Sequence, residues 1–233
     1  ARQRINRAYL ERMADARIIT RTTGWRRAEF LAFYLAAPVA MAVLLPPGMM
    51  FPVLFTVTGV GLVLLHITPG FTWRELFAGA GRIGWRFVLL FSAATVVTGA
   101  AVVWLTAPGA FGFLIRQNPG LMLMIAVLYP VLSALPQELV FRPLFFRRYG
   151  ALLPQGPAAQ ILLNAGVFSF AHLMYWSWIV AAMTFSGGLA FAWAYRVRGN
   201  FPEAVLLHSL AGIIVFALGL GVYFYSGNVQ RPF

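Results

Sequence analysis

Long runs of apolar residues dominate this chain, and short polar segments that carry most of the charge separate them. Each run approaches the roughly 20 residues that a helix needs to cross a bilayer, although the first two are short. We therefore predict seven membrane-spanning helices, over residues 30–45, 51–67, 85–107, 121–146, 158–175, 178–195 and 203–225. The fourth run holds Pro130, Pro136 and Pro143, and a break at these prolines would give an eighth span.

The composition agrees with lipid as the surrounding medium. Hydrophobic residues make up 61% of the 233 residues and charged residues 10%, against about 45–50% and about 25% in soluble domains. A soluble fold of this size cannot bury so much apolar surface. The predicted fold is an all-α, polytopic transmembrane helix bundle. Residues 1–29 would form a basic N-terminal segment, residues 30–225 the transmembrane domain and residues 226–233 a C-terminal tail.

The placement of the arginines predicts the orientation in the bilayer. All 18 basic residues are arginines and the net charge is +12. With the N-terminus in the cytosol, the segments on the far side hold only Arg116 and Arg231. This pattern predicts an integral protein of the plasma (inner) membrane with its N-terminus in the cytosol. It also argues against nucleic-acid binding, because the arginines flank the apolar runs. The segment Arg2–Arg27 would lie on anionic lipid as a surface helix, or form a solvated tail.

Glu138 is the one acidic residue that lies well inside an apolar run. An ionised carboxylate at that depth costs about 2.5–3.5 kcal/mol on insertion scales, so it needs a partner or a task. Arg142 follows four residues later, on the same face of a helix. The two residues could lock helix packing and do nothing more, or they could belong to a site.

Two of the three histidines, His172 and His208, also fall inside apolar runs. One glutamate and two histidines on three separate predicted helices can take a proton from water and return it to a leaving amide nitrogen. His66 ends a run beside Thr68-Pro69-Gly70, and we interpret it as structural. The chain has no cysteine, which excludes thiol nucleophiles and thiolate zinc sites. No serine stands in a Gly-x-Ser-x-Gly pattern.

Three short motifs carry a resemblance to a known family. They read Gln137-Glu138-Leu139-Val140-Phe141-Arg142, then Phe168 to His172, then His208-Ser209-Leu210-Ala211-Gly212. Their order and spacing resemble the Glu-Glu-x-x-x-Arg, Phe-x-x-x-His and His-x-x-x-Asn motifs of the CAAX-protease and bacteriocin-processing (CPBP) family. The likeness covers roughly residues 121–225 and is similar to a bacterial branch with Gln-Glu in place of Glu-Glu.

The resemblance implies an intramembrane endopeptidase that works without a metal or other cofactor. Its substrate would be a peptide or protein segment near the membrane. By the same resemblance, His172 helps to activate water, and His208 donates a hydrogen bond to the oxyanion. The oligomeric state is left open.

Two positions depart from the family motifs. Gln137 stands at the first glutamate and cannot act as a base, while Gly212 stands at the asparagine. Glu138 does not inherit the role automatically, because adjacent helical residues point about 100° apart. Three explanations stay open: a natural branch that uses Glu138, which we favour, a variant inactivated by replacement of glutamate, and a natural pseudoenzyme. Asn164, about two turns before His172, is a candidate for oxyanion support in place of the lost amide.

Two alternative functions follow from the same residues. Glu138, His172 and His208 match the ligand types of some catalytic zinc sites, so a zinc-dependent membrane protease is one alternative. The departures at Gln137 and Gly212 favour the other, a non-catalytic membrane scaffold or immunity protein with the CPBP fold. A transporter is disfavoured, because the chain shows one embedded acid and no internal repeat.

Overall fold

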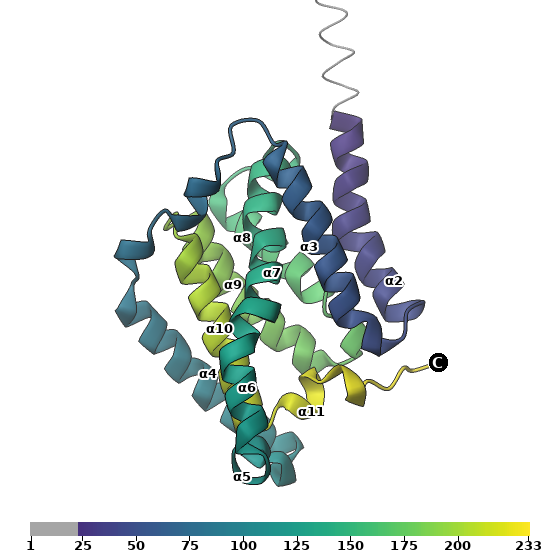
Figure 1. Cartoon of the computed structure of the whole chain (residues 1–233), viewed down its shortest axis with the longest axis vertical. Helices are drawn as coiled ribbons and strands as arrows, with labels where there is room; N and C mark the ends of the chain where they lie inside the picture. Colours follow the sequence, from purple (N-terminus) through teal and green to yellow (C-terminus); the bar gives the residue numbers. More distant parts are fainter. Residues whose placement is uncertain (1–22) are drawn as a thin grey trace, which may run out of the picture.

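The computed structural model describes residues 23–233, and the regular secondary structure in this range is helical (Figure 1). The basic segment Arg2–Arg27 lies outside the described residues except for its last few positions. Residues 23–31 are helical. The elements that follow are η1 (Ala32–Ala36), α2 (Ala37–Val43), η2 (Pro47–Met49), α3 (Met50–His66), η3 (Trp73–Phe77), η4 (Ala80–Arg82), α4 (Trp85–Thr106), η5 (Pro108–Ala110), α5 (Phe113–Gln117), α6 (Pro119–Tyr129), η6 (Pro130–Ala134), α7 (Leu135–Leu139), η7 (Val140–Arg148), η8 (Gly150–Leu152), α8 (Pro157–Phe170), η9 (Leu173–Tyr175), α9 (Trp178–Arg196), α10 (Phe201–Leu218), α11 (Gly221–Phe224) and η10 (Ser226–Asn228).

The outer surface of the bundle exposes large apolar side chains. Within residues 23–233, five helical stretches are long and apolar enough to cross a membrane: Pro47–His66, Trp85–Thr106, Pro119–Arg148, Trp178–Arg196 and Phe201–Leu218. Their outward side chains are apolar, as Leu105 and Leu123 show with exposed fractions of 79% and 66%. Such a surface is unfavourable in water and stable in hydrocarbon. The chain is therefore an integral membrane protein with a polytopic, all-α fold.

The predicted spans correspond to helical segments, but two of them fall outside these five stretches. Residues 23–43, which include most of the first predicted span, run as helix through η1 and α2. The fifth predicted span is represented by α8, which has only 14 residues. A count of seven spans therefore stays a prediction, as does the side of the membrane on which the N-terminus lies.

The proline-rich fourth run is one continuous helical stretch, Pro119–Arg148, rather than two. The chain passes Pro130 and Pro143 in the π-helical turns η6 and η7. Proline lacks an N–H and clashes with the carbonyl four residues earlier, and local π turns re-space the backbone around the ring. Tyr34, which is fully buried, ties the first helix to this stretch by donating its hydroxyl to the carbonyl oxygen of Val140 at 2.7 Å.

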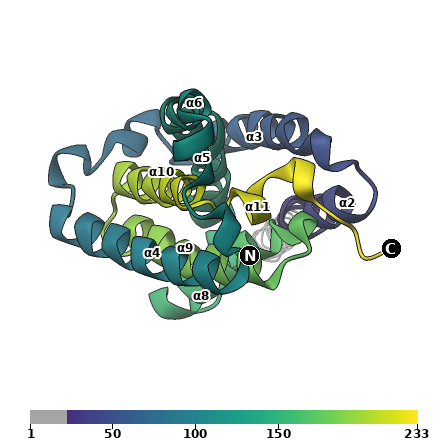
Figure 2. The same cartoon turned by 90° about the horizontal axis from the view of Figure 1, so that it is seen from below.

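Helix α10 runs through the middle of the bundle and contacts α4, α6, α7 and α9 (Figure 2). It starts where the side chain of Asn200 accepts a hydrogen bond from the backbone N–H of Glu203, which caps the helix. Helices α8 and α9 pack closely at Gly188 of α9. A Cβ built there would lie only 3.2 Å from the Cα of Ala165 in α8. This helix pair and α10 therefore fix the positions of both histidine motifs.

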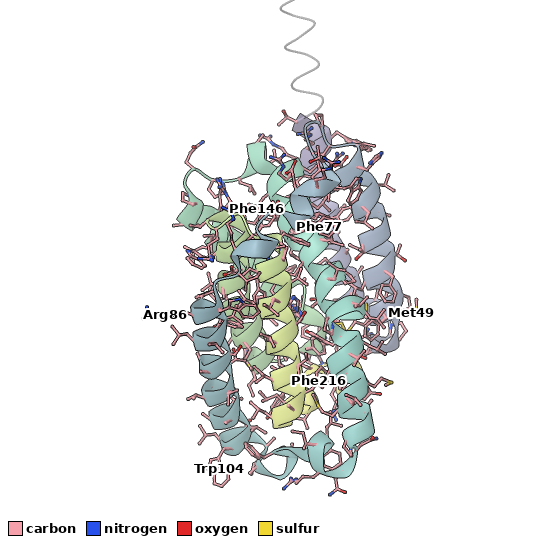
Figure 3. All side chains as sticks on the ribbon, turned by 60° about the vertical axis from the view of Figure 1, so that its left-hand side comes forward. Met49, Phe77, Arg86, Trp104, Phe146 and Phe216 are labelled. Carbon is pink, nitrogen blue, oxygen red and sulfur yellow. The ribbon has the colours of Figure 1, made fainter. Side chains whose placement is uncertain are left out.

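Ion pairs gather around the segments that connect the helices at one end of the bundle. Arg148 pairs with Glu29 at 2.6 Å, and this pair joins segments that are far apart in sequence. Arg198 pairs with Glu203 at 2.9 Å, at the start of α10. Figure 3 shows α4 running from Arg86 towards the opposite end, where Trp104 lies. The distribution is consistent with the sequence pattern from which the orientation was predicted.

Candidate active site

A cavity of about 840 Å³ lies among the helices, with a wall that is mostly apolar. Helices α2, α3, α4, α9 and α10 supply most of the lining, so the cavity is at the depth of the membrane spans. Polar groups that can carry chemistry are gathered on its wall: Tyr129, Ser133, Gln137, His172 and His208. An apolar pocket with a few converging polar groups is the expected form of a binding or catalytic site.

Gln137, and not Glu138, lines the cavity. Its amide nitrogen Nε2 donates a hydrogen bond to Ser133 Oγ at 3.0 Å, one helical turn away. Glu138 is fully buried and faces the protein interior behind the wall. The separation follows from helix geometry, since neighbouring residues point about 100° apart.

The Glu138 carboxylate takes part in three hydrogen bonds, two with Arg142 and one with His208. Arg142 donates to it through Nε at 2.9 Å and Nη2 at 3.3 Å, and His208 Nδ1 lies 2.9 Å from Oε1. The Arg142 guanidinium, itself fully buried, also lies over the rings of Phe168 and Phe191, at 5.2 and 5.8 Å from their centroids. A buried charge persists only when it is paired and hydrogen-bonded in this way.

His208 joins this buried pair to the cavity. A carboxylate can only accept a hydrogen bond, so His208 Nδ1 carries the proton that faces Glu138. The other ring nitrogen, Nε2, lies 3.3 Å from the hydroxyl of Tyr129. Phe191 stacks on the imidazole at 4.9 Å with an interplanar angle of 9°. The ring therefore has a fixed orientation, with one edge on the carboxylate and the other at the cavity wall.

His172 stands just beyond the C-terminal end of α8, which ends at Phe170. Its Nδ1 lies 2.8 Å from the carbonyl oxygen of Phe168 and must donate to it, which satisfies a carbonyl at the helix end. The ring of Phe168 contacts both His172 and His208, with centroids 4.9 and 5.4 Å away. The structure thus brings both histidines to one region of the cavity, where each contacts the ring of Phe168.

Comparison with protein families gives this arrangement a context. Residues 117–214 match the family model described as type II CAAX prenyl endopeptidase Rce1-like. We call this matched segment, residues 117–214, the Rce1-like domain. The match runs from the end of α5 through most of α10 and confirms the CPBP resemblance drawn from the motifs. Searches of curated proteins and of solved structures found no match.

The family match over residues 117–214 supports a membrane protease in general, and the apolar helices around this segment fit that setting. Tyr129, Ser133, Gln137, His172 and His208 all fall within the matched range. The family match does not say which of them carry out a reaction. The roles expected for five residues stay predictions: Gln137, Glu138, His172, His208 and Arg142.

Asn164 holds Arg142 and does not line the cavity of the Rce1-like domain. The side chain is fully buried; its Oδ1 accepts a hydrogen bond from Arg142 Nη1, and its Nδ2 donates to the carbonyl oxygen of Phe141 at 2.7 Å. Both ends of the amide are therefore engaged inside the protein. This placement gives no support to a role for Asn164 in binding an oxyanion.

The described part of the chain contains no group of three or more His, Asp or Glu side chains arranged to hold a metal ion. In the Rce1-like domain the Glu138 carboxylate is already bound by Arg142 and His208, and His172 lies across the Phe168 ring from His208. The ligand arrangement thus does not favour the zinc alternative. His66 lies away from the cavity and accepts a hydrogen bond from the Trp73 indole at 3.2 Å.

Sequence reasoning missed Tyr129 and gave no role to Ser133. A signal was present, because Tyr129, Ser133 and Gln137 follow one another at intervals of four residues in an apolar run. That spacing puts three polar side chains on one face of a helix. The same face lines the cavity.

Proposed function

We propose that this chain is an intramembrane endopeptidase that cleaves a peptide or protein segment near the membrane. The observation that carries the proposal is the convergence of two oriented imidazoles and a carboxamide on one apolar cavity inside the Rce1-like domain. The mostly apolar wall suits a substrate with an apolar segment or a lipid group. A site of this kind can desolvate a peptide bond while it retains a few polar groups for chemistry.

In this proposal His172 activates the water. Because its Nδ1 donates to the Phe168 carbonyl, the Nε2 of the neutral ring keeps its lone pair. That nitrogen would accept a proton from water as the oxygen attacks the peptide carbonyl, and would return the proton to the leaving amide nitrogen. Gln137 would orient the water through its Oε1, because its Nε2 is already bound to Ser133.

Glu138 and Arg142 act through His208 in this proposal and do not contact the substrate. The carboxylate fixes the proton on His208 Nδ1 and the direction of the ring, and Arg142 balances the buried negative charge. The expected role of Glu138 as the base is thereby replaced by a positioning role. This assignment follows from its complete burial behind the cavity wall.

One observation favours a second candidate function, a non-catalytic membrane scaffold. Gln137, which cannot accept a proton from water, occupies the cavity-facing position next to Ser133. If water activation requires a carboxylate at this position, the present chain binds peptide segments without cleaving them. Replacement of Gln137 by glutamate would then restore cleavage, since the two side chains have nearly the same shape.

The test compares four chains purified in detergent and reconstituted into vesicles: the unchanged protein and the variants His172→Ala, Gln137→Glu and His66→Ala. Quenched fluorescent peptides with apolar segments serve as substrates, with and without a farnesyl group, and mass spectrometry identifies the products. Removal of a general acid–base group costs about 10²–10⁴-fold in rate. His66→Ala is the matched control, because this histidine lies outside the cavity.

Cleavage by the unchanged chain that His172→Ala abolishes and His66→Ala leaves intact supports the protease. Cleavage by Gln137→Glu alone supports the scaffold for the natural sequence. Peptide cleavage that persists undiminished in His172→Ala overturns the assignment of this residue as the base. No cleavage by any of the four chains overturns the proposed function.

A further inference from the structure

Tyr129, the last residue of α6, occupies space that Gly212 of α10 leaves empty. A Cβ built at Gly212 would lie 2.1 Å from Cε1, 2.2 Å from Cζ and 2.6 Å from the hydroxyl oxygen of Tyr129. No side chain can share that volume with the phenol ring, since protein interiors are close-packed. The absence of a side chain at position 212 therefore allows a tyrosine from a neighbouring helix to enter the site.

The Tyr129 hydroxyl ends in a chain of hydrogen bonds that leads to the buried ion pair. It lies 3.3 Å from His208 Nε2, and His208 Nδ1 in turn faces Glu138 at 2.9 Å. In the neutral form of the ring with the proton on Nδ1, Nε2 is an acceptor and the phenol donates to it. Tyr129 and His208 both line the cavity.

Three other hydroxyl groups on the cavity wall donate to the backbone. Thr95, Thr184 and Ser186 each donate to a carbonyl oxygen four residues earlier in their own helix, at 2.8, 2.7 and 2.8 Å. Tyr129 differs from them, because its hydroxyl contacts an imidazole nitrogen of the site and the Ser133 side chain rather than the backbone. Its O–H can also turn about the Cζ–O bond without breaking a helix contact.

We propose that Tyr129 is the oxyanion donor of the site, a role that rests on the proposed peptidase function. When water attacks the peptide carbonyl, the carbonyl oxygen gains negative charge and becomes a stronger acceptor than the imidazole nitrogen. The phenol O–H turns from His208 Nε2 towards it and keeps its proton throughout. The proton released by water goes to His172 and then to the leaving nitrogen, so charge and protons balance. An interaction that forms only in the transition state raises kcat and leaves substrate binding unchanged.

The first test is Tyr129→Phe, which keeps the ring that fills the space over Gly212 and removes only the hydroxyl. Loss of one oxyanion donor lowers kcat by about 10²–10³-fold, and we expect KM and the melting temperature to stay close to those of the unchanged chain. Tyr195→Phe is the matched control, because Tyr195 stacks on Phe146 at 5.6 Å outside the cavity. A Tyr129→Phe variant with undiminished kcat overturns the proposal.

A second measurement does not depend on turnover. A peptidyl phosphinate has a tetrahedral, anionic centre and imitates the attacked peptide bond, whereas an uncleaved peptide imitates the ground state. We expect Tyr129→Phe to weaken phosphinate binding by the same factor as kcat and to leave peptide binding unchanged. Equal affinity of both chains for the phosphinate overturns the oxyanion role.

The two measurements separate the failure of this inference from the failure of the proposed function. Cleavage by the unchanged chain at a rate that Tyr129→Phe does not alter leaves the peptidase standing and removes Tyr129 from it. An unchanged chain that cleaves nothing, yet loses phosphinate affinity on Tyr129→Phe, overturns the peptidase and supports Tyr129 as the anion donor of this cavity.

Discussion

The buried pair of Glu138 and Arg142 should contribute strongly to the stability of the fold. Both side chains have no exposed surface, and two hydrogen bonds of 2.9 and 3.3 Å join them. Glu138→Gln keeps the shape but leaves the guanidinium charge uncompensated. Breaking a buried pair costs about 3–5 kcal/mol. For a chain of about this length, 1 kcal/mol shifts the melting temperature by about 2–4 °C, so we expect a fall of about 6–20 °C.

The assay is thermal unfolding in detergent, followed by circular dichroism, with an exposed pair as control. Glu75 and Arg147 also lie 2.9 Å apart, but their exposed fractions are 36% and 42%. Such a pair contributes about 0–1 kcal/mol, so Glu75→Gln should lower the melting temperature by at most about 4 °C.

A double variant separates the loss of pairing from the loss of packing. Glu138→Leu with Arg142→Met removes both charges and keeps similar volume, and replacements of this kind are often neutral. We expect it to melt above Glu138→Gln. If Glu138→Gln melts as the exposed-pair control does, the buried carboxylate is not what compensates Arg142, and the reasoning is refuted.

Two further predictions concern pH and metal. The side-chain hydrogen bond from Arg148 lowers the pKa of Glu29, so the pair stabilises the fold above the ordinary carboxyl pKa and loses this contribution as the pH falls through the lowered value. We expect Glu29→Gln to melt at a lower temperature than the unchanged chain at pH 7, and the difference to shrink in acid; a difference that grows in acid would contradict the sign. Because the site offers no cluster of metal ligands in the described residues, any peptidase activity should survive EDTA and 1,10-phenanthroline, and reversible loss on chelation would instead support the zinc alternative.

The sequence by itself determined the membrane-embedded, all-α fold and pointed to Gln137, His172 and His208, which line the cavity. The length of the apolar runs predicts membrane-spanning helices, because a helix that rises 1.5 Å per residue needs about 20 apolar residues to cross the bilayer. It also determined the Glu138–Arg142 pair, since residues four apart on a helix are neighbours in any tertiary context. The sequence also showed Gln137 and Gly212 as departures from the family motifs.

Only the tertiary structure decided which of these residues face the cavity and which lie buried behind its wall. Whether Gln137 or Glu138 faces the cavity depends on the rotation of α7 against its neighbours, which no local pattern fixes. Glu138 and His208 meet across 70 positions of sequence, and Tyr129 reaches the space over Gly212 from another helix. Contacts of this kind depend on how helices pack, because side chains from separate spans compete for the same close-packed volume.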